Sequence, residues 1–199
     1  MSKEIVGVIL AGGKSRRMGT DKAFLEVGGV PLIERVIGVL SPIFQTLAIV
    51  SKESKKFSSI KEVQLIQDLF PEQHALGGIY TALSHFRGKD CFVFSCDLPF
   101  LNPGLIRAMM REMNGYDALI PQSRYGLEPL HALYSGRCLD DIERQIHERH
   151  WNLAALLQKI KFSVLDLTVL RASDPEELSF FNINTPEELE KAQAIEMRL

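Results

Sequence analysis

The sequence predicts an α/β fold in which a mostly parallel sheet carries helices on both faces. Short apolar runs alternate with segments whose apolar residues recur at helical spacing, which is typical of strand–helix–strand units. The apolar runs are continuous and rich in β-branched residues, as in residues 5–10, so both faces of the sheet should be covered. The chain has 199 residues, 46% of them hydrophobic, and contains no linker-like stretch. We therefore expect one domain over residues 1–199.

Seven strands and six helices follow from these patterns in chain order. The expected strands cover residues 5–10, 46–50, 63–66, 91–95, 117–121, 131–134 and 163–167. The expected helices cover residues 31–41, 76–86, 103–113, 137–148 and 152–159, with a last helix starting at Pro186. Pro31 suits a first helical turn, and Asn102 and Thr185 are suitable N-cap residues.

Residues 121–130, "PQSRYGLEPL", have the weakest pattern of regular structure and are a candidate active-site lid. In parallel sheets, ligands bind beyond the carboxyl ends of the strands. Functional residues are therefore expected in the loops that follow the strands.

Composition excludes several classes of protein. The net charge is −2, which gives no overall basic surface for nucleic acid. The apolar runs are too short for a membrane span, and no signal-peptide pattern precedes the first strand. Three cysteines match no zinc spacing and are interpreted as reduced thiols. We expect a cytoplasmic protein without nucleic-acid or membrane partners.

The first strand ends in an unusual loop, "LAGGKSRRMGTDKAFL". Two adjacent glycines, Gly12 and Gly13, remove two Cβ atoms and permit positive φ, so a ligand can approach the backbone. Four basic residues (Lys14, Arg16, Arg17 and Lys22) then accompany one acid, Asp21. Exposed N–H groups and positive charge favour an anion such as a polyphosphate. A merely solvated basic loop is the alternative.

Two known phosphate-binding motifs do not fit this loop. A Walker A motif ending in Gly13-Lys14-Ser15 requires Gly at position 8, which is Val8. The dinucleotide motif G-x-G-x-x-G fails because Gly12 and Gly13 are adjacent and the next glycine is Gly19. The loop therefore supports neither a P-loop ATPase nor a Rossmann oxidoreductase.

Acidic residues follow two other expected strands. Asp97 stands after the strand within "FVFSCDLPFL" and is a candidate ligand of Mg²⁺ bridging phosphates. Asp68 follows the third strand and is a candidate acceptor from a base or a sugar. For both residues, a carboxylate that caps a turn is the alternative. His131 is an acid/base candidate, with a structural histidine on a strand as the favoured interpretation.

With these segments in view, the sequence resembles the molybdenum cofactor guanylyltransferase family, within the nucleotidyltransferases of the glycosyltransferase-A type. The similarity extends from about Ile5 to Gln193. It is carried by "VILAGGKSRRMGTDKAFL", "FSCDLPFL", "EPLHALY" and "FFNINTPEEL". The resemblance implies a Rossmann-like fold. It also implies transfer of GMP from GTP to the phosphate of molybdopterin or the molybdenum cofactor, with release of pyrophosphate.

The resemblance also implies roles for individual residues. It places Leu10, Ala11, Gly12, Lys22, Asp68 and Asp97 at GTP, and Asn182 and Asn184 at molybdopterin. Asp97 would bind Mg²⁺, and the catalytic residues would be Lys22, Arg16 and Asp97. Ser51 stands where the family often has a nucleotide-binding Asn, and serine lacks the paired donor and acceptor of the amide. Further implied partners are proteins of molybdenum cofactor biosynthesis or chaperones.

The sequence is compatible with two other functions. The first is a related transferase that uses CTP, or a sugar phosphate as acceptor, on the same fold. The second is an accessory protein that binds a nucleotide without turnover. Lys22 and Asp97 together favour an enzyme, because binding without turnover requires neither this ammonium nor this carboxylate.

Overall fold

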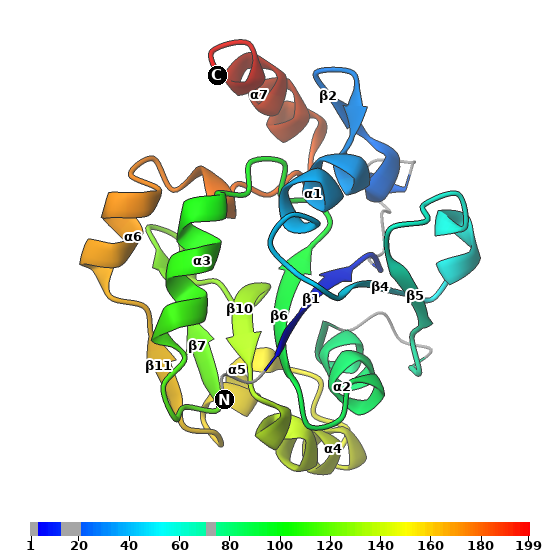
Figure 1. Ribbon diagram of the computed structural model, residues 1–199, viewed down its shortest axis with the longest axis vertical. Coiled ribbons are helices and arrows are strands. Elements are labelled where there is room, and N and C mark those ends of the chain that lie inside the picture. Colours follow the sequence, from blue (N-terminus) through cyan, green and yellow to red (C-terminus); the bar gives the residue numbers. More distant parts are fainter. Residues whose placement is uncertain (1–3, 13–20, 71–74) are drawn as a thin grey trace.

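The structure is a computed structural model that describes residues 4–12, 21–70 and 75–199. Its centre is a seven-stranded sheet with the order β11-β7-β10-β6-β1-β4-β5 (Figure 1). The strands are β1 Ile5–Leu10, β4 Leu47–Ser51, β5 Gln64–Gln67, β6 Asp90–Ser95, β7 Ala118–Ile120, β10 His131–Tyr134 and β11 Phe162–Val164. Within this sheet, as far as the structure describes it, β10 alone runs antiparallel to its neighbours, β6 and β7. The predicted mostly parallel sheet is confirmed.

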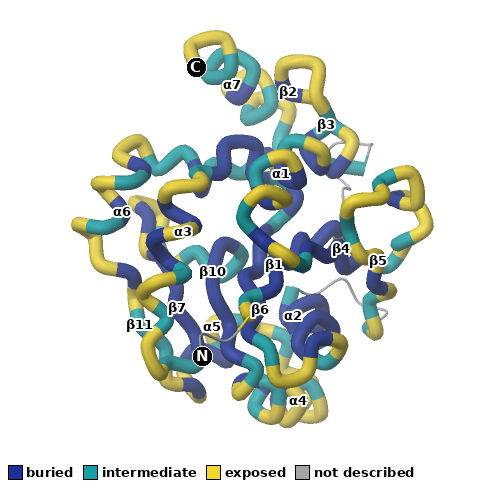
Figure 2. Tube along the Cα trace, in the orientation of Figure 1, coloured by how far each residue is buried: buried dark blue, intermediate teal, exposed yellow. Residues whose placement is uncertain are grey.

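Helices cover both faces of the sheet, as predicted. One face carries α1 Leu32–Leu40, α3 Pro103–Glu112 and α6 Leu167–Ser173. The other carries α2 Ala75–His85, α4 Leu139–His147 and α5 Leu153–Leu157. Figure 2 shows that the central strands and α2 are mostly buried, whereas α4 and α6 have exposed outer sides. Within the described residues, no helix combines the length and apolarity needed to cross a bilayer.

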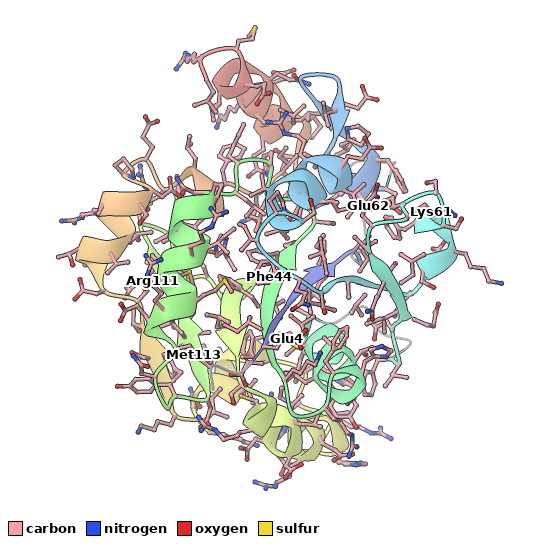
Figure 3. The ribbon with its side chains drawn as sticks, viewed as in Figure 1. Glu4, Phe44, Lys61, Glu62, Arg111 and Met113 are labelled. Atoms are coloured by element: carbon pink, nitrogen blue, oxygen red, sulfur yellow. The ribbon has the colours of Figure 1, made fainter. Side chains whose placement is uncertain are left out.

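The core follows from strand alternation, because successive side chains point to opposite faces of a sheet. In β6, Phe92 and Phe94 pack towards α1 and α3, whereas Cys91 and Val93 pack towards α2. Phe44, in the middle of the molecule in Figure 3, meets the rings of Phe92 and Phe94 edge-on at 6.0 and 5.9 Å. Lys61 and Glu62 lie at the periphery in the same view.

The structure corrects the sequence analysis where elements are very short. The segment 121–130 is not irregular throughout, because β8 Gln122–Ser123 and β9 Gly126–Leu127 form a hairpin. A second hairpin joins β2 Glu26–Val27 and β3 Val30–Pro31, with positive φ at Gly28 and Gly29. Two-residue strands are too short to leave a period in the sequence, so neither hairpin was predicted.

Two further corrections concern element boundaries. Pro31 ends β3, and α1 begins at Leu32. The last predicted strand, 163–167, stops at Val164 because the Asp166 side chain accepts from the Thr168 N–H at 2.7 Å and starts α6. The structure also contains short 3-10 helices: η1 Lys22–Phe24, η2 Ser54–Phe57, η3 Gly136–Cys138 and η4 Leu178–Phe180.

The last helix, α7 Pro186–Glu196, packs on the β2–β3 hairpin, away from the sheet (Figure 1). Thr185 caps it in a reciprocal capping box with Glu188, which confirms the predicted N-cap. The Arg35 guanidinium of α1 pairs with the Glu196 carboxylate and donates to the Val27 carbonyl at 3.1 Å. Arg35 thus ties helix α7 to the hairpin.

Candidate active site

The candidate site lies at the edge of the sheet where the parallel strands β1, β4, β5 and β6 end. The residues of interest in these loops are Leu10 to Gly12, Ser51, Asp68, and Ser95 to Asp97. The Ala11 N–H donates to the Val50 carbonyl at 3.0 Å, and the Cys96 N–H donates to the Leu10 carbonyl at 3.3 Å. The loop after β1 is therefore fixed to the strand ends on both sides.

A small cavity of about 60 Å³ opens between the ends of β1 and β6. It is lined by Leu10, Ala11, Gly12, Asp21, Lys22, Ser95, Cys96 and Asp97. Five of the residues that the family resemblance implies for GTP thus share one cavity. Burial raises the pKa of the Cys96 thiol, so this cysteine stays protonated and is no thiolate nucleophile.

Lys22 lies where three parts of the chain meet. It opens η1, which begins after Asp21, whose side chain accepts from the Ala23 N–H at 3.3 Å. The Lys22 ammonium lies 3.2 Å from Asp97 Oδ2 and donates to Asn184 Oδ1 at 2.5 Å. The side chains of Lys22 and Asp97 are 19% and 13% exposed, so this ion pair is partly shielded from water.

Asp97 is positioned from both sides. The Ser95 hydroxyl, at the end of β6, donates to Asp97 Oδ1 at 2.6 Å. The Ile183 N–H donates to the Asp97 carbonyl at 3.1 Å, which fastens the segment before α7 to this loop. Ser95 was not singled out from the sequence, although a hydroxyl two positions before a strand-end carboxylate could have indicated it.

The described part of the chain contains no group of three or more His, Cys, Asp or Glu side chains arranged for a metal ion. Mg²⁺ does not need such a cage, because it commonly binds one or two carboxylates together with substrate phosphates and water. A single oriented carboxylate, Asp97, with the Ser95 hydroxyl beside it fits that mode of binding.

Gly12 leaves space at the cavity. A Cβ atom at Gly12 would meet no atom within 4 Å among the described residues. The expected positive φ is not found at Gly12, so the backbone conformation there does not require glycine. Relative to the residues that the structure describes, the missing side chain provides open space rather than a special conformation.

Asp68 and Ser51 lie farther along the same edge. Asp68 Oδ1 accepts from the Phe70 N–H and from the Thr81 hydroxyl, each at 3.1 Å, so this carboxylate does cap its turn. Its other oxygen has no hydrogen-bond partner within the described ranges. β5 is three strands from β6, so at about 4.8 Å per strand Asp68 is roughly 14 Å from Asp97 along the edge. The Ser51 side-chain oxygen accepts from the Glu53 N–H at 3.2 Å.

The two asparagines of "NINTP" are separated in space. Asn184 contacts Lys22, as described above. The Asn182 amide donates to the Phe180 carbonyl at 3.1 Å and lines a second cavity beside Leu98, Glu128 and His131. Glu128 was not singled out from the sequence. Arg16 and Lys14 lie outside the described residues.

His131 is a buried residue of strand β10. Its ring lies among Phe92, Phe94 and Phe180, with centroids 5.6, 5.2 and 5.1 Å away. Burial lowers the pKa of His131 to about 3, opposed by the backbone of Ser179. The ring is therefore neutral at physiological pH. Neither ring nitrogen has a hydrogen bond of normal geometry with a described residue, so the expected structural hydrogen bond is not found.

An open α/β sheet with a cation, an oriented carboxylate and a glycine-bearing loop at the ends of its strands is typical of proteins that bind nucleoside phosphates. Residues 7–162 match the MobA-like NTP transferase domain. The chain belongs to this family of nucleotidyltransferases.

Relatives and solved structures agree with this assignment. A protein of Desulfosudis oleivorans named molybdenum cofactor guanylyltransferase is 37% identical over 96% of this chain and 95% of its own length. A probable molybdenum cofactor guanylyltransferase of Pelotomaculum thermopropionicum is also 37% identical, over 96% and 93%. The crystal structure of molybdopterin-guanine dinucleotide biosynthesis protein A from Archaeoglobus fulgidus has a TM-score of 0.87 and 35% identity, covering 98% of this chain and all of that one.

Proposed function

We propose that this protein transfers GMP from GTP to the terminal phosphate of molybdopterin or the molybdenum cofactor, releasing pyrophosphate. The observation that carries the proposal is the position of Lys22, between Asp97 at the backbone-lined cavity and Asn184 of the C-terminal segment. One cation thus lies where a nucleotide phosphate and an acceptor phosphate would meet. The names of the relatives that match nearly the whole chain support the same substrates.

The strand ends suggest how GTP lies on the protein. The α-phosphate would lie at Lys22 and Asp97, and the guanine and ribose would extend past β1 towards Ser51 and Asp68. The estimated 14 Å between Asp97 and Asp68 suits opposite ends of a nucleotide. The free space at Gly12 would let the nucleotide touch the backbone.

The chemistry needs no strong general base. An oxygen of the acceptor phosphate is already anionic and attacks the α-phosphorus. The bond between that phosphorus and the bridging oxygen breaks, and pyrophosphate leaves with the electron pair. Catalysis then consists of positioning and charge stabilisation, the role proposed for Lys22 and Arg16. Mg²⁺, held by Asp97, would supply further neutralisation of phosphate charge.

The decisive experiment combines the purified protein with GTP, Mg²⁺ and molybdopterin, and identifies the product by mass. A panel of the four NTPs, with pyrophosphate release as readout, separates the proposal from a CTP enzyme. Sugar phosphates in place of molybdopterin test the other acceptor. GTP binding without pyrophosphate release in the presence of molybdopterin would instead indicate a non-catalytic accessory protein.

Asp97→Ala should remove nearly all turnover and leave the fold intact. The carboxylate is the candidate ligand of Mg²⁺, so its loss removes several kcal/mol of transition-state stabilisation. Ser58→Ala, an exposed change in the loop after η2, is the control. Near-normal product formation by Asp97→Ala with unchanged Mg²⁺ dependence would exclude Asp97 from the site.

The state of the cysteines bears on the cellular setting. All three cysteines are free and buried, which suits a reducing compartment such as the cytoplasm. Proteins that supply or receive the molybdenum cofactor are the expected partners.

A further inference from the structure

A second cavity lies directly beside the candidate active site. It measures about 140 Å³ and is lined by Leu98, Glu128, Pro129, Leu130, His131 and Asn182. Pockets that enclose a whole drug-sized ligand measure roughly 300–1,000 Å³. This cavity therefore suits one ring at the end of a larger molecule.

The position of the cavity relates it to the acceptor. Leu98 follows Asp97 directly, and Asn182 precedes the Lys22 partner Asn184 by two residues. The Ser95 N–H donates to the Leu130 carbonyl at 3.0 Å, which ties the cavity wall to the end of β6. The cavity lies on the β10 side of β6, whereas the proposed GTP site extends to the β1 side. A molecule in this cavity would thus approach Lys22 from the side opposite to GTP.

Glu128 is the charged residue of the cavity, and hydrogen bonds fix its backbone. Its N–H donates to the Pro121 carbonyl at 2.9 Å, and its carbonyl accepts from the His131 N–H at 3.1 Å. The Ser123 hydroxyl, from β8, donates to Glu128 Oε1 at 2.6 Å. Within the described ranges, Oε2 has no hydrogen-bond partner.

The surroundings of this carboxylate suit a hydrogen-bond donor. Burial raises the pKa of Glu128, and the hydrogen bond from Ser123 opposes that rise. Glu128 is half-buried and Oε2 is not among the buried polar atoms without a partner, so water reaches this oxygen and a ligand's N–H groups can replace that water. Pro129 and Leu130 add apolar surface beside it, which suits the flat face of a heterocycle.

We infer that Glu128 recognises the 2-amino-4-oxopyrimidine edge of the pterin in the acceptor, accepting hydrogen bonds from its ring N–H and its amino group. This inference rests on the proposed function, which makes a pterin the acceptor. Guanine carries the same donor edge. The cavity is assigned to the pterin because it lies on the side of β6 away from the proposed nucleotide site. Two adjacent donors match a carboxylate, in the way a guanidinium does.

The first test is Glu128→Gln, which keeps the shape and presents an amide N–H₂ to the donor edge. We expect KM for molybdopterin to rise about tenfold or more, with kcat and KM for GTP unchanged. The control is Glu112→Gln, the same charge change at the exposed end of α3. An unchanged KM for molybdopterin would overturn the inference. A raised KM for GTP alone would assign Glu128 to guanine and also overturn it.

The second test needs no variant and no turnover. Wild-type protein is titrated with 6-hydroxymethylpterin and with 6-hydroxymethyllumazine, in which a carbonyl replaces the 2-amino group. We expect the pterin to bind about tenfold more tightly, and Glu128→Gln to abolish this preference. Equal binding of both probes to wild-type protein would overturn the inference. A pterin preference without product formation from GTP would keep the inference and reject the proposed function.

Discussion

At the scale of single residues, the site depends on one side chain that contacts two distant segments of the described chain. Lys22 contacts both Asp97 and Asn184, so its ammonium is held by an anion and by a neutral amide at once. Its charge is therefore positioned before any ligand arrives, which is the condition for efficient electrostatic stabilisation.

Lys22→Ala should lower kcat by 10²-fold or more and weaken GTP binding much less, because the charge it stabilises develops during transfer. Single-turnover rates and GTP affinities, at low and high salt, measure the two effects. Lys55→Ala, an exposed change of the same charge in η2, is the control. If both variants show only similar, salt-sensitive weakening of GTP binding, Lys22 provides general attraction and is not catalytic.

Gly12→Val should weaken GTP binding severely and change thermal stability little. Its Cβ would enter open space at the cavity, and the backbone conformation there is accessible to other residues. Melting and GTP titration on the same sample measure both quantities. Gly7→Ala is the contrasting variant, because its Cβ would lie 2.8 Å from Phe44 and Leu47 side-chain atoms. A sharp loss of stability in Gly12→Val with normal GTP binding would assign the glycine to the turn.

At the scale of elements, the strand-end loops could be predicted and their long-range partners could not. Lys22 and Asp97 were expected together because parallel strands end at one edge of the sheet. The contact between Lys22 and Asn184 spans 162 residues and leaves no local pattern. Glu128 was missed for a different reason, since it directly follows a hairpin whose two-residue strands have no measurable alternation.

The packing of helix α7 against the β2–β3 hairpin should depend on Arg35. Arg35→Met removes the bonds to Glu196 and to the Val27 carbonyl and leaves the Glu196 carboxylate half-buried. We expect a loss of about 2 kcal/mol in the free energy of unfolding and a lower turnover, because α7 follows directly on Asn184. Chemical denaturation and product assays measure these effects.

The control is Arg144→Met on α4, whose ion pair with Asp141 is exposed. Its loss should cost less than about 1 kcal/mol. Equal costs in the Arg144 and Arg35 variants would show that Arg35 contributes no more than a surface ion pair.

At the scale of the whole molecule, a buried histidine makes the fold sensitive to acid. The pKa of His131 is lowered to about 3 in the folded state, against about 6.5 when unfolded. Below pH 6.5 the unfolded chain therefore binds a proton that the folded chain excludes. Stability contributed by the neutral ring is complete above pH 6.5 and is lost as the pH falls towards 3.

His131→Leu should flatten this dependence. At 1.36 kcal/mol per pH unit, the wild-type protein should lose roughly 2 kcal/mol between pH 6.5 and pH 5 that the variant retains. Denaturant unfolding of both proteins across this range measures the difference. Parallel curves would mean that His131 titrates normally in the folded state. In either case we expect the pH–rate profile to lack a catalytic group at position 131.

The overall architecture was the most predictable level, because seven apolar runs of strand length can be buried only in a sheet covered on both faces. The sequence did not predict the antiparallel direction of β10 or the order of the strands, and both were seen in the structure. Both depend on which side of β6 each crossover takes, a choice that contacts between distant segments decide.

The contact between Lys22 and Asn184 has a consequence for the order of events during synthesis. A growing polypeptide exposes Lys22 long before position 184, 162 residues later, leaves the ribosome. The sheet can begin to assemble from its earlier strands during that interval, yet the lysine has no amide to contact. Once the sheet has formed, the segment after β11 Phe162–Val164 still has to dock before Asn184 reaches Lys22. The nascent chain therefore acquires its fold before its reactive centre, and transfer activity should arise only at the final stage of folding.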